Sequence, residues 1–104
     1  MKRIVNAEIE KIGLYYNGHT CRTDFRIELN GNGWGGTVTI PFGDISEFAD
    51  MMDKSTRMDF EDGIFLSDLA GTIVQVKMDD NGKIVELGGP LTDESEFMLI
   101  GRES

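Results

Sequence analysis

The most reactive side chains in this sequence are His19 and Cys21, which lie two positions apart. On a β-strand such neighbours share a face, so the imidazole can hold the cysteine as a thiolate nucleophile. Cys21, however, falls in the apolar series of a predicted strand, and His19 lies beside a predicted turn. The chain has one histidine and one cysteine, which excludes a two-histidine metal site and an intrachain disulfide. We interpret both residues as structural and expect no catalytic site.

Carboxylates offer a second route to chemistry. Asp79, Asp80 and Asn81 resemble the start of a calcium loop, but the D-x-[DN]-x-[DN]-G spacing and the glutamate at its twelfth position are absent. The segment is typical of a hairpin turn instead. Other carboxylates, such as Asp24 and Glu28, form no matched acid–base pair in the sequence. We therefore predict no metal, no cofactor and no enzyme activity.

A glycine-rich segment surrounds the only tryptophan, Trp34. Closely spaced glycines leave backbone N–H groups accessible and can form an anion-binding nest. No P-loop Lys or Ser/Thr follows, and no helix is predicted to begin there, so a nucleotide-binding motif is not supported. The segment indicates either a tight turn with Trp34 capping the core or a binding patch anchored by its indole. The candidate binding residues are Asn32, Gly33, Trp34, Gly35 and Gly36.

Acidic residues recur every three positions along a predicted helix. Asp44, Glu47, Asp50 and Asp53 either form a stripe that a basic protein groove recognises or are a solvated helix face. The first three are additional candidate contact residues.

Charge limits the classes of partner. The net charge is −9, with +1 in residues 1–43 and −10 in residues 44–104. Phosphate backbones repel such a domain, so we expect no direct nucleic-acid binding. No apolar run approaches a signal peptide or a membrane span, so we expect a cytoplasmic protein without membrane contact.

The N-terminal half alternates as β-strands do. Residues 5–9 alternate before the phase slips, which predicts a β-bulge near Glu10–Ile12. Asn17-Gly18 favours a type I′ turn into a second strand at Thr20–Leu29, giving a long hairpin. The inward face of the second strand is predicted to hold Cys21, Thr23, Phe25, Ile27 and Leu29.

A third strand and a helix follow. Asn30–Gly36 indicates a glycine turn, and Thr37–Phe42 a strand that Pro41 ends or places at an edge. Asp44 then fits the N-cap of a helix of about eleven residues, with Glu47 completing a capping box. The apolar stripe predicted to lie across the sheet comprises Ile45, Phe48, Ala49 and Met52.

The remaining elements are short. We predict a helical turn at Ser67–Ala70, a strand at Thr72–Met78, a hairpin into Lys83–Leu87 and a final strand within residues 97–100. The expected fold is a single α+β domain over residues 1–104, with an ordered core at about residues 3–100. We expect a mostly antiparallel sheet or partly open barrel of about five to six strands with one helix packed on it.

The order of motifs resembles a family of small, uncharacterised phage- and prophage-encoded proteins with a GxGFGG-like hairpin segment. The matching segments here are Asn6-Ala7-Glu8-Ile9, Ile12-Gly13-Leu14, Gly31-Asn32-Gly33-Trp34-Gly35-Gly36, Phe42-Gly43, Asp68-Leu69-Ala70-Gly71 with Val74 and Val76, and Gly82-Lys83-Ile84. This chain departs from the pattern by having Trp34 where Phe is usual and by an acidic stretch at residues 50–62. The resemblance implies a phage context and carries over no catalytic residue.

Three functions follow as hypotheses. The leading one is a non-enzymatic accessory protein that binds a host protein, with a host-defence component as one candidate. The second is sequestration of a nucleotide or other small molecule in the glycine hairpin, although no cation lies between Arg26 and Lys54. The third is a structural, self-associating protein, with a homodimer formed through an edge strand near Pro41.

Overall fold

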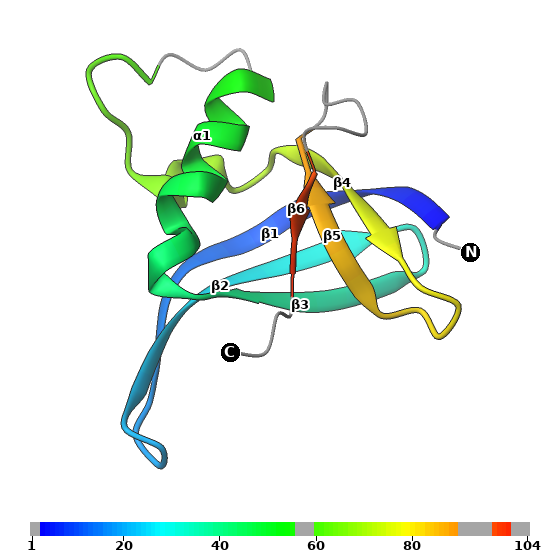
Figure 1. The fold of residues 1–104 in the computed structure, drawn as a ribbon, viewed down its shortest axis with the longest axis horizontal. Coiled ribbons are helices and arrows are strands. Elements are labelled where there is room, and N and C mark those ends of the chain that lie inside the picture. Colours follow the sequence, from blue (N-terminus) through cyan, green and yellow to red (C-terminus); the bar gives the residue numbers. More distant parts are fainter. Residues whose placement is uncertain (1–2, 56–59, 90–96, 101–104) are drawn as a thin grey trace.

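The structure is a computed structural model of the chain, and it describes residues 3–55, 60–89 and 97–100. Within these residues six strands form one sheet with a single α-helix, which confirms the predicted α+β fold class (Figure 1). The strands are β1 (Arg3–Asn17), β2 (Arg22–Gly31), β3 (Trp34–Ile40), β4 (Ile73–Met78), β5 (Ile84–Gly88) and β6 (Met98–Leu99). The helices are η1 (Phe42–Asp44), α1 (Ile45–Ser55) and η2 (Leu66–Leu69), of which η1 and η2 are 3-10 helices.

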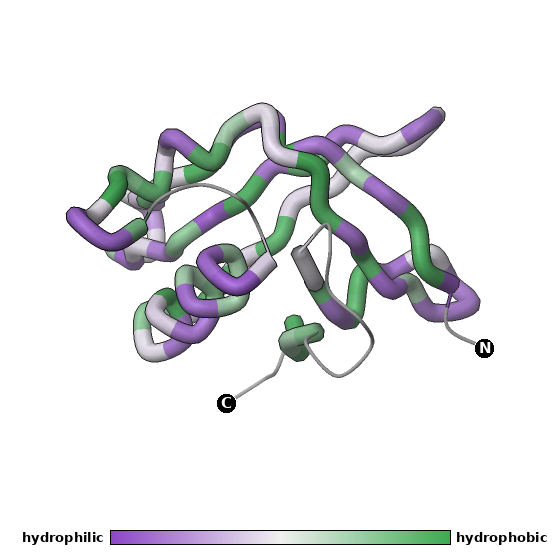
Figure 2. The backbone as a smooth tube through the Cα atoms, turned by 90° about the horizontal axis from the view of Figure 1, so that it is seen from above, coloured by the Kyte–Doolittle hydropathy of each residue, from purple (hydrophilic) through white to green (hydrophobic). Residues whose placement is uncertain are grey.

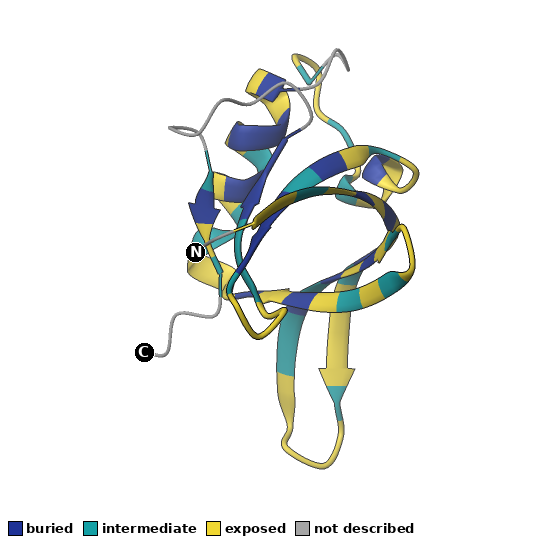
Figure 3. Ribbon diagram, turned by 90° about the vertical axis from the view of Figure 1, so that its right-hand side faces the viewer, coloured by how far each residue is buried: buried dark blue, intermediate teal, exposed yellow. Residues whose placement is uncertain are grey.

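The sheet is antiparallel, has the order β3-β2-β1-β4-β5-β6 and curls into a partly open barrel (Figure 3). The long strand β1 lies at its centre, pairing with β4 through its first half and with β2 through most of its length. The pairing slips between Ile9 and Lys11, so Glu10 is an extra residue and the predicted bulge is confirmed. A bulge of this kind bends and twists its strand, which helps the sheet to curl.

The core lies between the concave side of the sheet and α1. Alternate residues of β1, β2 and β3 are buried there, and the hydropathy pattern along the backbone follows the same alternation (Figure 2). Phe48 of α1 is fully buried, and its ring centroid lies 5.8 Å from that of Phe25 in β2. This aromatic contact joins the helix to the sheet.

The first hairpin turn differs from the prediction. Asn17 pairs with Arg22, so four residues connect β1 and β2 where a two-residue type I′ turn was predicted. The Asn17 Oδ1 atom accepts hydrogen bonds from the N–H groups of His19 (2.9 Å) and Thr20 (3.4 Å), and this local capping favours the longer turn. Cys21 has a φ of 56° and is exposed, so its predicted place in the inward series is wrong.

The glycine segment is mostly strand, which corrects the predicted turn at Asn30–Gly36. β2 continues to Gly31 and β3 begins at Trp34, so only Asn32-Gly33 connects them. Gly33 has a φ of 80°, a conformation that glycine adopts without strain. β3 ends at Ile40, immediately before Pro41, which fits the prediction that Pro41 ends the strand; the predicted extension to Phe42 is wrong, because Phe42 begins η1.

The helix has the predicted length of 11 residues, but its start differs. The Asp44 N–H donates to the Pro41 carbonyl at 2.9 Å, so Asp44 already lies within a helical turn and is not the N-cap. The buried face comprises Phe48, Met51, Met52 and Ser55, whereas Ile45 and Ala49 are half-buried. The 3-10 turn η1 runs directly into α1, and the N-cap position of η1 belongs to Pro41.

The C-terminal elements agree with the sequence analysis. The predicted turn, two strands and final short strand correspond to η2, β4, β5 and β6. Val74, Val76 and Met78 of β4 are buried. Residues 56–59 and 90–96 of the expected ordered core lie outside the described residues. Among the described helices, none combines the length and apolar character needed to cross a bilayer.

Replacing Phe48 with Ala tests the contact between helix and sheet. We expect the free energy of unfolding to fall by about 3–5 kcal/mol, because the substitution leaves a cavity between α1 and β2. Urea denaturation followed by circular dichroism measures this loss. Phe65→Ala is the matched control, since Phe65 is 78% exposed, and we expect a change below about 0.5 kcal/mol. Equal losses in the two variants would contradict this account of the core.

Candidate functional site

Trp34 begins β3 and lies half-buried against the end of the β2–β3 hairpin. It pairs with Gly31 across the two-residue connection. A methyl group on Gly31 would overlap the indole atoms Cε2 and Nε1 of Trp34, so the missing side chain allows the ring to lie against the backbone. The glycine at position 31 thus fixes the orientation of the candidate anchor.

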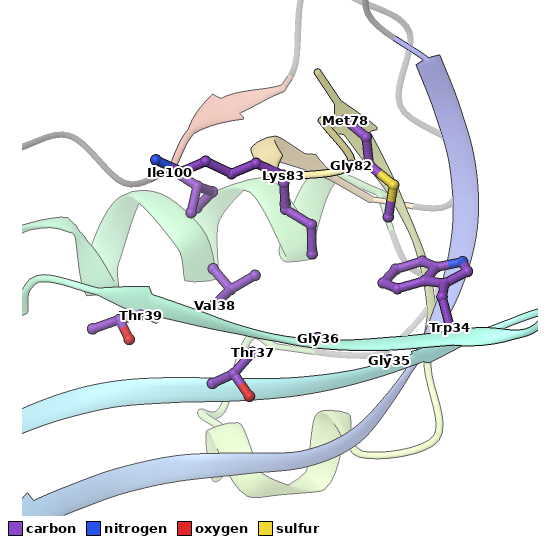
Figure 4. A pocket seen from close by; sticks show the side chains of 11 residues that line it. Trp34, Gly35, Gly36, Thr37, Val38, Thr39, Met78, Gly82, Lys83 and Ile100 are labelled. Atoms are coloured by element: carbon purple, nitrogen blue, oxygen red, sulfur yellow. The ribbon is translucent and has the colours of Figure 1, made fainter. Parts of the chain in front are cut away.

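A hollow of about 350 Å³ separates β3 from the β4–β5 hairpin (Figure 4). Six consecutive residues of β3, numbers 34–39, line one side of it. A strand that presented one face would contribute alternate residues, so β3 borders the hollow with its edge. The opposite side is formed by Met78, Gly82, Lys83, Ile84 and Ile100.

This border is the free edge of the sheet, because β3 is a terminal strand and pairs only with β2 among the described strands. Antiparallel strands direct the N–H and C=O groups of alternate residues toward a neighbour. The Gly31–Trp34 pair closes the two-residue connection, so Trp34, Gly36, Val38 and Ile40 bond to β2. Gly35, Thr37 and Thr39 therefore direct their N–H and C=O groups away from β2. No other backbone group in the described residues bonds to these three.

The walls of the hollow are mainly apolar. Trp34 and Val38 point into it from β3, whereas Thr37 and Thr39 point to the other side of the strand (Figure 4). A Cβ atom on Gly36 would come within 3.3 Å of the Ile84 Cδ1 atom, so the glycine permits the close approach of β3 to β5. Among the described lining residues, Lys83 carries the only charge, and it is exposed.

Trp34 also lines a second hollow, of about 590 Å³. Asn32 belongs to this second surface together with Arg3, Ile4, Val5, Asn6 and Gln75. Gly33 is exposed in the turn and lines neither hollow. The five candidate binding residues at positions 32–36 therefore do not form one surface, and only Trp34, Gly35 and Gly36 border the free edge.

The acidic residues form a separate surface. Glu47 and Asp50 are exposed on α1, Asp44 is half-buried, and none of them lines the hollow beside Trp34. The Asp50 carboxylate lies 3.0 Å from the Lys54 Nζ atom in an exposed i,i+4 pair, which contributes little to stability. The structure therefore does not join the acidic stripe and the glycine segment into one site.

His19, Cys21 and Asp79, the residues with potential catalytic or metal-binding chemistry, lie in or beside turns. His19 and Cys21 are exposed in the β1–β2 turn, where the Cys21 Sγ atom lies 3.7 Å from the Gly18 carbonyl. The Asp79 Oδ1 atom accepts hydrogen bonds of 2.9 Å from the N–H groups of Lys83 and Asn81. These bonds, that from Lys83 most of all, hold the pKa of Asp79 below its ordinary value. The described residues contain no group of three or more side chains suited to a metal ion.

Sequence reasoning missed the residues that make the edge accessible. Thr37 and Thr39 were assigned to a strand without a role, and Met78, Lys83 and Ile84 lie more than thirty residues along the chain. Pro41 was the one available signal, because proline is typical of edge strands. The side opposite β3 could not be predicted, since it depends on how far the sheet curls.

No family model, curated protein or solved structure matches this chain.

Replacing Gly31 with Ala tests the packing of the Trp34 indole against the backbone of residue 31. We expect the new methyl group to displace the Trp34 ring toward solvent, which shifts the tryptophan fluorescence maximum to longer wavelength. Gly13→Ala is the control, because Gly13 also lies in a strand and a Cβ atom there meets nothing within 4 Å. An unchanged emission spectrum in Gly31→Ala would contradict the proposed packing.

Proposed function

We propose that this chain is a non-enzymatic, phage-type accessory protein that binds a host protein in the host cytoplasm. The partner contributes an extended segment that pairs with β3. The free edge carries this proposal, because the N–H and C=O groups of Gly35, Thr37 and Thr39 bond to no other backbone group among the described residues and lie beside an apolar hollow. Addition of a strand to an open sheet edge is a common way in which proteins bind peptides.

The size of the hollow favours a single strand as the ligand. Neighbouring strands in a sheet lie about 4.8 Å apart, and the hollow of about 350 Å³ extends along β3 on this side. Gly82, Lys83 and Ile84 bound its far side. These residues would obstruct the edge of a second sheet, so we expect a single extended segment along the edge of β3 at Gly35, Thr37 and Thr39.

The lining residues predict the type of peptide. Alternate side chains of an added strand face the concave side of the sheet, where Trp34, Val38 and Ile84 provide apolar contacts. The intervening side chains face solvent beside Thr37 and Thr39. Lys83 at the rim favours an acidic residue in the segment. We therefore expect a segment with alternating apolar and polar residues and an acidic residue near one end.

The acidic surface has a secondary role in this proposal. Glu47 and Asp50 lie on α1, away from the hollow, and residues 44–104 have a net charge of −10. A field of this sign accelerates encounter with a basic surface of the partner without adding specific contacts. The hollow is poorly suited to bind an anionic nucleotide, because Lys83 is the only cation among the described residues that line it.

A peptide-binding assay with two variants at one position tests the proposal. A display library of segments from bacterial proteins is selected against the chain, and dissociation constants are measured for the enriched peptides. Thr37→Pro removes an N–H group that points to the free edge and leaves the hydrogen bonds to β2 intact. We expect it to weaken binding at least roughly tenfold, the equivalent of about one hydrogen bond with its steric cost.

Thr37→Val is the matched control, because it keeps the N–H group and suits a strand. We expect it to bind as the parent does, and circular dichroism establishes that both variants are folded. Trp34→Ala should also weaken binding by removing the anchor. The proposal is wrong if the library yields no binder, or if folded Thr37→Pro binds the selected peptides as tightly as Thr37→Val.

A further inference from the structure

The first residues of β1 extend past the end of the β2–β3 hairpin. Pairing with β2 stops at Ala7, whereas pairing with β4 continues to Arg3. The N–H and C=O groups of Ile9 bond to the segment that precedes β4, at 2.9 and 2.7 Å. Because the direction alternates along a strand, Ile4 and Asn6 direct their N–H and C=O groups away from β4. No other backbone group among the described residues bonds to these two there.

The second hollow borders this unpaired part of β1 and is rich in hydrogen-bond donors. It is lined by Arg3 and by three residues with carboxamide side chains, Asn6, Asn32 and Gln75, and none of its described lining residues is acidic. The chain as a whole has 19 acidic and 10 basic residues, so this surface differs from the average of the molecule. Guanidinium and amide N–H groups together suit a carboxylate as ligand.

Arg3 lies where the two hollows meet. It lines the second hollow, and its Nη2 atom donates to the Sδ atom of Met78 at 3.6 Å. Met78 lines the hollow beside β3, and Trp34 lines both hollows. Figure 4 shows the Met78 side chain beside the indole and the first part of β1 passing beyond Trp34. A thioether is a weak acceptor, so the guanidinium keeps donors for a stronger one.

The direction of β3 decides which end of an added strand meets Arg3. β3 runs from Trp34 to Ile40, so an antiparallel strand has its C-terminal end at Trp34 and a parallel strand has its N-terminal end there. An α-carboxylate is attracted by the guanidinium, whereas an α-ammonium group is repelled. The Lys83 ammonium lies toward Ile100, at the other end of the hollow (Figure 4), where it can meet an acidic side chain of the same segment.

We propose that the segment bound by β3 is the C-terminus of the partner, antiparallel to β3, with its α-carboxylate held by Arg3 and the neighbouring carboxamides. The proposal rests on the proposed pairing with β3, and it adds the direction of the segment and the chemistry of its end. An aspartate or glutamate side chain offers the same group from within a chain. The end of a chain fits better, because β1 lies in the path of a strand that continues past Trp34.

Matched peptides test the terminal group by isothermal titration calorimetry. The probes are C-terminal segments of bacterial proteins, selected from a library displayed with free carboxylates and synthesised as the acid, the C-terminal amide and a form extended by two glycines. We expect the amide to bind about tenfold or more weakly than the acid, because the contact between carboxylate and guanidinium is lost. The extended form should also bind more weakly, since its carboxylate lies beyond Arg3. Equal affinities of acid and amide would overturn the proposal, and tight binding of the extended form would assign the contact to a side-chain carboxylate.

A variant of Arg3 connects this preference to one side chain. Arg3→Gln should bind acid and amide with similar affinity, because the acid loses its ionic partner. Arg22→Gln is the matched control: it makes the same change in net charge, and Arg22 is exposed and lines neither hollow. It should keep the preference for the acid. A preference that survives in Arg3→Gln, or that falls equally in both variants, would contradict a direct contact with Arg3.

A nitroxide label on the N-terminus of the bound peptide reports its direction. In an antiparallel complex the label should broaden the amide resonance of Thr39 more than that of Gly35, and the reverse order would contradict the proposed orientation. Peptides that require the Thr37 N–H group yet bind equally as acid and amide would overturn only the recognition of the C-terminus, leaving the β3 edge as the binding site. A library without any binder would overturn the proposed function together with it.

Discussion

The incomplete closure of the sheet is the constraint on which the rest of the structure depends. The bulge at Glu10 bends β1, and the sheet curls until β3 lies opposite the β4–β5 hairpin. Among the described residues this approach stops short of pairing, so the curl creates a hollow and β3 has a neighbouring strand on one side only. In a fully closed barrel the same sequence would have no unbonded backbone at Thr37 and no space beside Trp34.

The glycines around Trp34 serve this geometry in different ways. Gly31 lets the indole lie against the backbone, and Gly36 permits β3 to approach Ile84. Gly33 supplies the positive φ of the connection between β2 and β3. The sequence of the glycine-rich segment suggests a phosphate-binding nest. In the structure the segment instead forms parts of two paired strands, and it places the Trp34 side chain at the rim of a hollow. Its chemistry is that of backbone hydrogen bonding and apolar contact.

Much of the fold could be predicted because its strands and helix have strong local periodicity. The alternation in β2, the phase slip at Glu10 and the apolar stripe of α1 each have a direct physical counterpart. The errors in the first hairpin arose where a residue departs from a local preference: Asn17 caps a longer turn, and Cys21 adopts a left-handed conformation. For the site, Trp34 was predictable as an uncommon residue among glycines, whereas the part formed by Met78 and Ile84 depends on the curl, which no short pattern encodes.

Amide hydrogen exchange along β3 in the free protein is the most direct measurement of the central claim. The amides of Gly36, Val38 and Ile40 bond to β2 and should exchange slowly, at rates governed by unfolding. Those of Gly35, Thr37 and Thr39 should exchange fast, because no described residue accepts their protons. An alternating pattern of slow and fast exchange is the predicted result. Equal protection of all six amides would show that the edge of β3 is already occupied, and would contradict the account.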